Sequence, residues 1–114
     1  MRIVNRDTFI GMPPGTLFSK YEPCVFGDLM IKGESIIFDG GNDFFYQQIA
    51  DSVKASGSNE LVNILDDSEE NGTSFDMDFH LEGRDGLFEY GQLFAIWEPS
   101  DVSALIDRLK EVVG

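Results

Sequence analysis

Short apolar stretches separated by turn residues fill residues 12–38. Pro13, Pro14 and Gly15 open this segment, and Gly27 and Gly33 interrupt it, a pattern that favours strands over a helix. The expected strands are residues 16–20, 25–31 and 35–38. Because their connections are short, they are expected to form an antiparallel meander or a small curled sheet.

Residues 43–53 fit two structures. Asn42 or Asp43 could cap a helix in which apolar residues recur at near-helical spacing. Phe44, Tyr46 and Gln48 also alternate, as they would on one face of a strand. The pattern leaves helix and strand open for this segment.

A short helix is expected to begin at Asn59, which is a good capping residue. Leu61, Ile64 and Leu65 would then share one face. Residues 66–74 are polar and acidic and contain an Asn-Gly pair, which predicts an exposed loop.

From residue 75 to residue 82 the pattern has a period of two. Four apolar side chains alternate with Asp76, Asp78, His80 and Glu82, which predicts a strand with one polar face. Residues 93–97 predict a second strand, antiparallel to the first. Pro99 suits the first turn of a helix, and the apolar positions from Val102 to Val113 predict a C-terminal helix.

Together these elements predict an α+β fold, with a small antiparallel sheet and two or three helices including the C-terminal one. Whether the sheet closes into a barrel is left open. A chain of 114 residues fits a single domain, residues 1–114.

The charge of the chain restricts its partners. It carries 21 acidic and 8 basic residues, a net charge of −13, which opposes direct binding to nucleic acid or to anionic lipid. A protein partner with a basic surface is favoured instead. No apolar run is long enough for a membrane span or a signal peptide, and the single Cys24 has no disulfide partner, so a cytoplasmic location is expected.

The acidic residues concentrate in one part of the chain. Residues 66–101 hold eleven acids and only one base, Arg84. The predicted strand would place a line of carboxylates beside the acidic loop, and such a surface could occupy a basic groove as a nucleic-acid mimic. The alternative is an ordinary solvated face that keeps the chain soluble. The candidate partner-binding residues are Asp66, Asp67, Glu69, Glu70, Asp76, Asp78, Glu82 and Arg84.

Arg84 lies in the sequence Gly-Arg-Asp-Gly, which predicts a tight turn. Its functional interpretation is an exposed contact on a loop held by a rigid hairpin. The alternative is that Arg84 only pairs with neighbouring acids.

Catalytic and cofactor chemistry has little support. Residues 67–78 resemble a calcium-binding EF-hand loop only in part, because Asp78 replaces the bidentate Glu and Ser74 replaces an apolar residue. Cys24 and His80 are the only thiol and imidazole, and nothing in their spacing predicts that they meet; Cys24 is expected to be a small buried side chain. No phosphate-binding glycine motif occurs. We therefore expect no enzymatic activity, no metal and no cofactor.

Residues 15–24 and 31–34, together with 83–88 and 93–98, resemble small uncharacterised acidic proteins of bacteriophages and prophages. The resemblance implies a host-cell cytoplasm as the setting, and no residue role transfers from it. Small acidic phage proteins often resemble inhibitors of host defence, including DNA mimics and anti-CRISPR proteins. The leading hypothesis is therefore a non-enzymatic binding protein with an acidic surface. The alternative is a structural or assembly protein that forms homo-oligomer or virion contacts.

Overall fold

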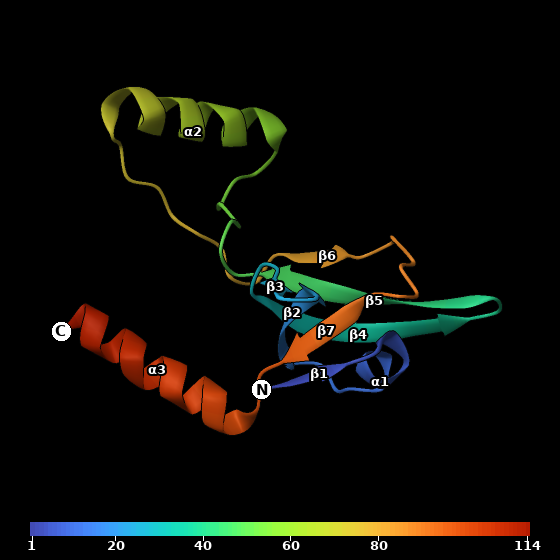
Figure 1. The fold of residues 1–114 in the computed structure, drawn as a ribbon. Coiled ribbons are helices and arrows are strands. Elements are labelled where there is room, and N and C mark those ends of the chain that lie inside the picture. The colour runs from blue at the N-terminus through green and yellow to red at the C-terminus, as the bar shows by residue number, and fades with distance from the viewer.

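Seven β-strands and three α-helices make up the chain in a computed structural model that describes residues 1–114 (Figure 1). In chain order the elements are β1 (Arg2–Val4), α1 (Arg6–Ile10), β2 (Leu17–Glu22), β3 (Val25–Phe26), β4 (Met30–Phe38), β5 (Gly41–Gln48), α2 (Ser58–Asn71), β6 (Glu82–Arg84), β7 (Leu93–Ile96) and α3 (Pro99–Val113). None of the helices is long and apolar enough to cross a membrane.

The strands form one antiparallel sheet in the order β1-β7-β2-β4-β5-β6, with β3 paired to β2. The sheet is open, since β1 and β6 lie at opposite edges and do not pair. The α+β class, the antiparallel sheet and the C-terminal helix that the sequence predicts are therefore confirmed. The longest pairing is the β4–β5 hairpin, in which Phe38 lies opposite Gly41 and the register shifts between Lys32 and Ser35.

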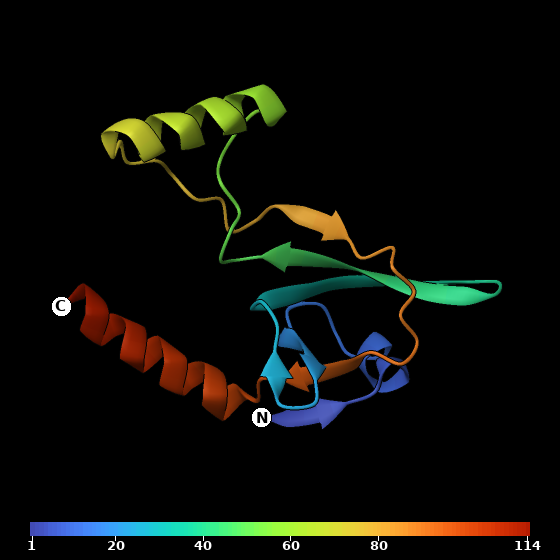
Figure 2. The ribbon, with the colours of Figure 1, turned by 45° about the horizontal axis from the view of Figure 1, so that its top comes forward.

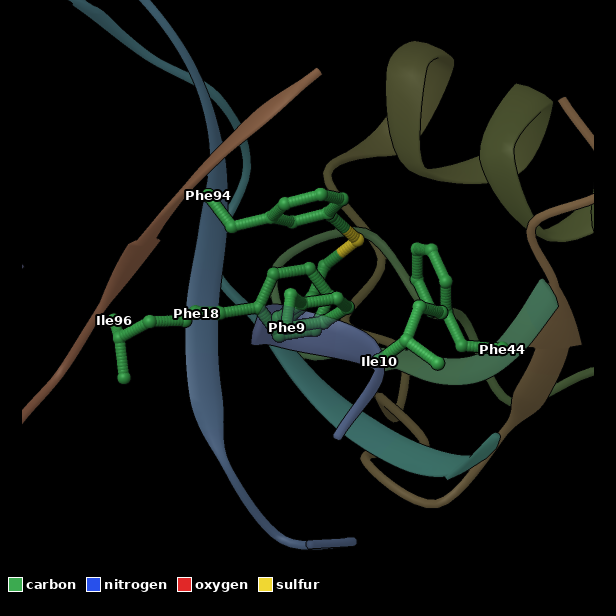
Figure 3. Packing of buried hydrophobic residues seen from close by; sticks show 7 residues of the cluster. Phe9, Ile10, Phe18, Phe44, Phe94 and Ile96 are labelled. Carbon is green, nitrogen blue, oxygen red and sulfur yellow. The ribbon is translucent and has the colours of Figure 1, made fainter. Parts of the chain in front are cut away.

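The hydrophobic core lies between α1 and the sheet. Asn5 caps α1 by accepting a hydrogen bond from the Thr8 N–H at 2.9 Å, and the helix turns Phe9 and Ile10 inward. Phe9 is fully buried and stacks on Phe94 with ring centroids 4.0 Å apart (Figure 3). The core cluster consists of Phe9, Ile10, Phe18, Met30, Phe44, Phe94 and Ile96.

Helices α2 and α3 extend away from this core on the same side of the molecule (Figures 1 and 2). Neither helix contains a buried residue, and neither packs substantially against another helix or strand. The radius of gyration is 16.4 Å, whereas a compact domain of this length has about 13 Å. The core is thus confined to the sheet and α1.

Several local predictions agree with the structure. The strands expected at residues 16–20 and 93–97 are β2 and β7, and the C-terminal helix begins at Pro99 as expected. The ambiguous residues 43–53 begin as a strand, because β5 runs through Gln48 between β4 and β6. The predicted break at Gly33 is wrong, since β4 continues across it with a bulge.

Two local predictions in the acidic region are wrong. The expected loop at residues 66–74 is helical as far as Asn71, where α2 ends. The expected strand at residues 75–82 does not form: only Met77 makes a β-bridge, with Val53, and β6 begins at Glu82. A strand needs a neighbour for its backbone groups, and residues 79–81 have none. Consequently β7 pairs with β1 and β2 and not with this segment.

Candidate functional site

The candidate residues lie on and around one excursion of the chain, residues 49–81, which connects β5 to β6. Backbone hydrogen bonds close its root: Lys54 N–H donates to the Asp76 carbonyl at 3.0 Å, and Asp78 N–H donates to the Ser52 carbonyl at 2.6 Å. Beyond this root two extended arms hold α2 away from the sheet (Figure 2). The excursion therefore presents α2 to solvent on a short two-armed stem.

The second half of α2 carries four of the candidates, Asp66, Asp67, Glu69 and Glu70, all of which are exposed. With Glu60 the helix holds five acidic residues and no basic one. Gly72 ends the helix in the left-handed conformation (φ 69°), and its N–H donates to the Ser68 carbonyl at 2.8 Å. Helix α2 is thus an acidic helix that ends at Gly72.

These carboxylates are poorly placed for the stability of α2. The C-terminal end of a helix carries partial negative charge, so each acid in the last turn costs about 0.3–1 kcal/mol instead of stabilising it. Asn71 compensates in part, because its side chain donates to Asp67 Oδ1 at 2.9 Å and lowers the pKa of Asp67. Asp67 therefore stays ionised at neutral pH. The placement of the acids does not follow from the needs of the helix.

The returning arm mixes acidic and apolar side chains. Asp76 is exposed, whereas Asp78 is half-buried and accepts a hydrogen bond from the His80 N–H at 2.9 Å. Between and beyond these acids, Phe75, Phe79 and Leu81 are 40%, 51% and 46% exposed. This arm offers large apolar side chains next to the acidic helix α2.

The two remaining candidates belong to the sheet. Glu82 opens β6 as an exposed residue opposite Gln47. Arg84, with half of its side chain exposed, donates through Nε to the carboxylate of Asp43, which is fully buried. Arg84 is thus tied to the sheet and does not extend the acidic surface of α2.

Asp43 is the centre of this contact. Burial would raise the pKa of its carboxyl, but hydrogen bonds from Arg84 and from the backbone N–H groups of Gly86 and Phe44 outweigh burial and lower the pKa. The Gly86 N–H lies 3.0 Å from Asp43 Oδ1. Asp43 therefore fixes the turn after β6 to the neighbouring strand β5.

A neighbouring group of charges, in which Arg6 is buried and Lys20 partly buried, gave no signal in the sequence. Arg6 is 2% exposed and donates to the side chain and carbonyl oxygens of Asn42, each at 3.0 Å. Lys20 Nζ lies 2.8 Å from Asp85 and 3.1 Å from Glu89. Burial would lower the pKa of Lys20, but these two partners raise it. The group anchors the β6–β7 connection, and its members come together only in the folded chain.

The residues considered for catalysis or metal binding are far from such an arrangement. Cys24 is exposed in the β2–β3 turn, with a φ of 70°, and is not the buried side chain that the sequence predicts. Asp67 to Asn71 are helical, so residues 67–78 do not form an EF-hand loop. No group of three His, Cys, Asp or Glu side chains is placed to hold a metal ion.

The fold and site define an α+β protein with an open antiparallel sheet that carries an acidic helical excursion. No protein-family model, no curated protein and no solved structure matches the chain.

Proposed function

We propose that the protein is a non-enzymatic binding protein, which uses α2 and its returning arm to engage a basic surface on another protein in the cytoplasm. The observation that carries this proposal is the position of α2. It stands away from the sheet with five acids, no base and no buried residue. A helix that adds nothing to the core but concentrates charge of one sign is suited to contact a partner.

Charge supports the choice of partner. Residues 49–82 hold nine of the 21 acidic residues and one of the eight basic residues. Such a local field attracts a basic protein surface over a distance of about 8 Å at physiological ionic strength and increases the rate of association.

The apolar side chains beside the acids would hold the complex once it has formed. Complementary charge contributes more to association rate and specificity than to affinity, which comes mainly from a few buried anchors. Phe75, Phe79 and Leu81 are exposed on the returning arm and can supply these anchors. A purely solubilising surface would not need them.

A basic groove that normally holds phosphates is the partner surface that the acidic helix α2 fits best. The carboxylates crowded at residues 66–70 of α2 would replace phosphates, and a nucleic-acid-handling protein whose groove is occupied would be inhibited. This is the form that inhibition of a host defence protein would take. Direct binding of nucleic acid by α2 is opposed by like charge.

The test is affinity capture with a variant that removes charge from α2. The variant Asp66→Asn, Asp67→Asn, Glu69→Gln and Glu70→Gln keeps the size of each side chain. The matched control, Glu22→Gln, Glu34→Gln, Asp39→Asn and Asp51→Asn, removes four exposed acids elsewhere. Neither variant should lower the melting temperature of the wild type, since none of these side chains is buried.

The wild type and the control should recover the same basic protein from a lysate of cells that contain the chain, and the α2 variant should not. The recovered protein should be lost in about 1 M salt, where the Debye length falls to about 3 Å. Added duplex DNA should displace it if the groove binds nucleic acid. Equal recovery by the α2 variant would contradict the proposal.

A further inference from the structure

A hollow in the sheet lies beside the hydrophobic core. Helix α1 covers Phe18 and Phe44, which both pack against Phe9 (Figure 3). Side chains on one face of a strand recur at every second residue, so Lys20 and Tyr46 continue this face beyond the helix. The hollow that they line there measures about 290 Å³. This volume is close to the lower limit of about 300 Å³ for ligand pockets and suits a ligand about as large as one side chain.

Much of the lining of the hollow is apolar. Met30 and Phe44 belong to the core cluster, and they line the hollow together with Tyr46 and Leu87. Leu87 is 62% exposed, so it borders the opening. These side chains favour an apolar chain inside the hollow, and the ring of Tyr46 is also suited to face a cation.

One carboxylate of the lining has no cationic partner. The Gly27 N–H donates to the Lys20 carbonyl at 2.8 Å, which holds the β3–β4 connection against β2 and brings Asp28 to the hollow. Asp28 is exposed and takes part in none of the ion pairs of the chain. Its contact inside the hollow is Nε2 of Gln48, which lies 3.5 Å from Asp28 Oδ2. The Asp28 carboxylate is therefore available to a ligand.

Gln48 adds an unsatisfied hydrogen-bond acceptor. Its Oε1 is buried and accepts no hydrogen bond, while its Nε2 faces Asp28. Asp28 fixes this orientation, because exchanging the two amide atoms would turn an oxygen towards the carboxylate. An unpaired buried acceptor is costly, and a ligand N–H that reached it after a small rotation of the amide would remove this cost. Asp28 and Gln48 both lack a strong donor.

The one cation of the lining is already neutralised. Lys20 Nζ lies 2.8 Å from Asp85, whose side chain is only 3% exposed, and 3.1 Å from Glu89. An anionic ligand would have to compete with both carboxylates for Lys20, whereas a cationic ligand would find Asp28 unpaired. The three carboxylates also outweigh the one ammonium group, so the hollow attracts a cation.

We propose that this hollow binds an ammonium or guanidinium group that is carried on a short apolar chain. The chain contacts Met30, Tyr46 and Leu87, and the cationic end donates hydrogen bonds to Asp28 and Gln48. Two sources share this chemistry, a free amine or guanidine and the lysine or arginine side chain of another protein.

The position of the hollow makes both sources accessible. Gln48 ends β5, and its carbonyl accepts a hydrogen bond from Ser52 Oγ at 2.7 Å at the root of the excursion. A basic protein that engaged the excursion would therefore have its side chains near the hollow. None of the acidic residues of α2 lines the hollow, so binding there does not depend on the function proposed above.

Titration of the isotope-labelled full chain with n-butylguanidinium, followed by NMR, tests the proposal. The backbone amide signals of Gly27, Asp28 and Leu87 and the side-chain amide signals of Gln48 should shift together. For so small a probe we expect a dissociation constant on the order of 1–10 mM. Shifts spread evenly over the acidic residues of the chain would overturn the proposal, because they would show only non-specific attraction of a cation.

Two probes of similar size test the charge of the ligand. The neutral n-butylurea should bind about tenfold more weakly than n-butylguanidinium, because its hydrogen bonds to Asp28 are not charge-assisted on the donor side. Pentanoate should not bind. If pentanoate bound more tightly than n-butylguanidinium, Lys20 would govern the hollow and the proposal would be wrong.

Two variants test the residues that hold the cation. Asp28→Asn should weaken the binding of n-butylguanidinium about tenfold, whereas the matched control Asp39→Asn, which removes another exposed carboxylate, should bind like the wild type. Gln48→Met keeps the length of the side chain and should weaken binding without lowering the melting temperature, since it also removes the unsatisfied oxygen. Equal binding by Asp28→Asn and the wild type would overturn the site.

A second titration separates the two sources of the ligand. N-acetyl-arginine methylamide presents the guanidinium group on a peptide backbone. Binding as tight as that of n-butylguanidinium would assign the hollow to a protein side chain, and binding of n-butylguanidinium alone would assign it to a free small molecule. No binding of either probe would overturn the proposal. The variant that removes charge from α2 should bind n-butylguanidinium like the wild type, so this test and that of the proposed function can fail separately.

Discussion

Asp43→Asn should destabilise the fold by about 1–2 kcal/mol, because it replaces charge-assisted hydrogen bonds with neutral ones. The carboxylate is fully buried and accepts from Arg84 and from the N–H groups of Gly86 and Phe44. Asparagine keeps one acceptor oxygen, whereas Asp43→Ala removes all three contacts and should cost about 3 kcal/mol. Arg84 is half exposed and can be rehydrated, so we expect less than the loss of a fully buried ion pair.

Urea unfolding followed by Trp97 fluorescence measures these differences, with the exposed Asp39→Asn as the control. The pKa of Asp43 is lowered in the folded state, so its ionised carboxylate contributes its full share to stability above the ordinary carboxyl pKa of about 3.9. It is lost as the pH falls through the folded pKa. The gap between wild type and Asp43→Asn should therefore be constant from about pH 5 to 7 and shrink in stronger acid. A gap no larger than that of Asp39→Asn would refute the role given to Asp43.

Two further substitutions test the core. Phe9→Ala should lower the free energy of unfolding by about 3–5 kcal/mol, since Phe9 is fully buried against Phe94. The control Phe26→Ala, at a side chain that is 58% exposed, should change the free energy of unfolding little. Equal losses in the two variants would show that Phe9 does not belong to the core. Lys32 is 1% exposed, and its pKa is lowered by burial, an effect that the charge of Glu34 only partly offsets. The folded state thus binds the Lys32 proton less tightly than the unfolded state, so wild-type stability should rise with pH up to the ordinary lysine pKa. Lys32→Met should remove this rise, and at pH 7 its free energy of unfolding should equal that of the wild type or exceed it by about 1 kcal/mol. A large loss of stability would show that the hydrogen bonds from Lys32 to Gly33 and Ser35 outweigh the cost of burial.

The elements that the sequence predicted correctly carry their signal locally. Residues 93–97 form a short apolar run that becomes β7, and α3 has both a proline at its first turn and a regular apolar stripe. The strand predicted at residues 75–82 from alternating apolar and polar residues does not form. Alternation tells which side chains would share a face, but not whether another strand lies alongside.

The candidate site was predicted by composition more than by geometry. The sequence shows where the acidic residues concentrate, but it predicted a loop where α2 continues to Asn71. Acidic residues are unfavourable at the C-terminal end of a helix, so their presence at residues 66–70 did not predict that α2 continues there. The contacts of Asp43 and Arg6 had no local pattern at all, since Asp43 meets Arg84 and Arg6 meets Asn42 only when the sheet has formed.

The excursion that carries α2 is not needed to complete the sheet. Gln47 lies opposite Glu82, so β5 and β6 form a hairpin that a short turn could close. Residues 49–81 contribute none of the seven core side chains, yet they expose Phe75, Phe79 and Leu81 and crowd carboxylates at the end of a helix. Each of these features lowers the stability or solubility of the isolated chain, and each becomes favourable when a basic, partly apolar surface covers it. These costs support the proposal that the excursion binds a partner.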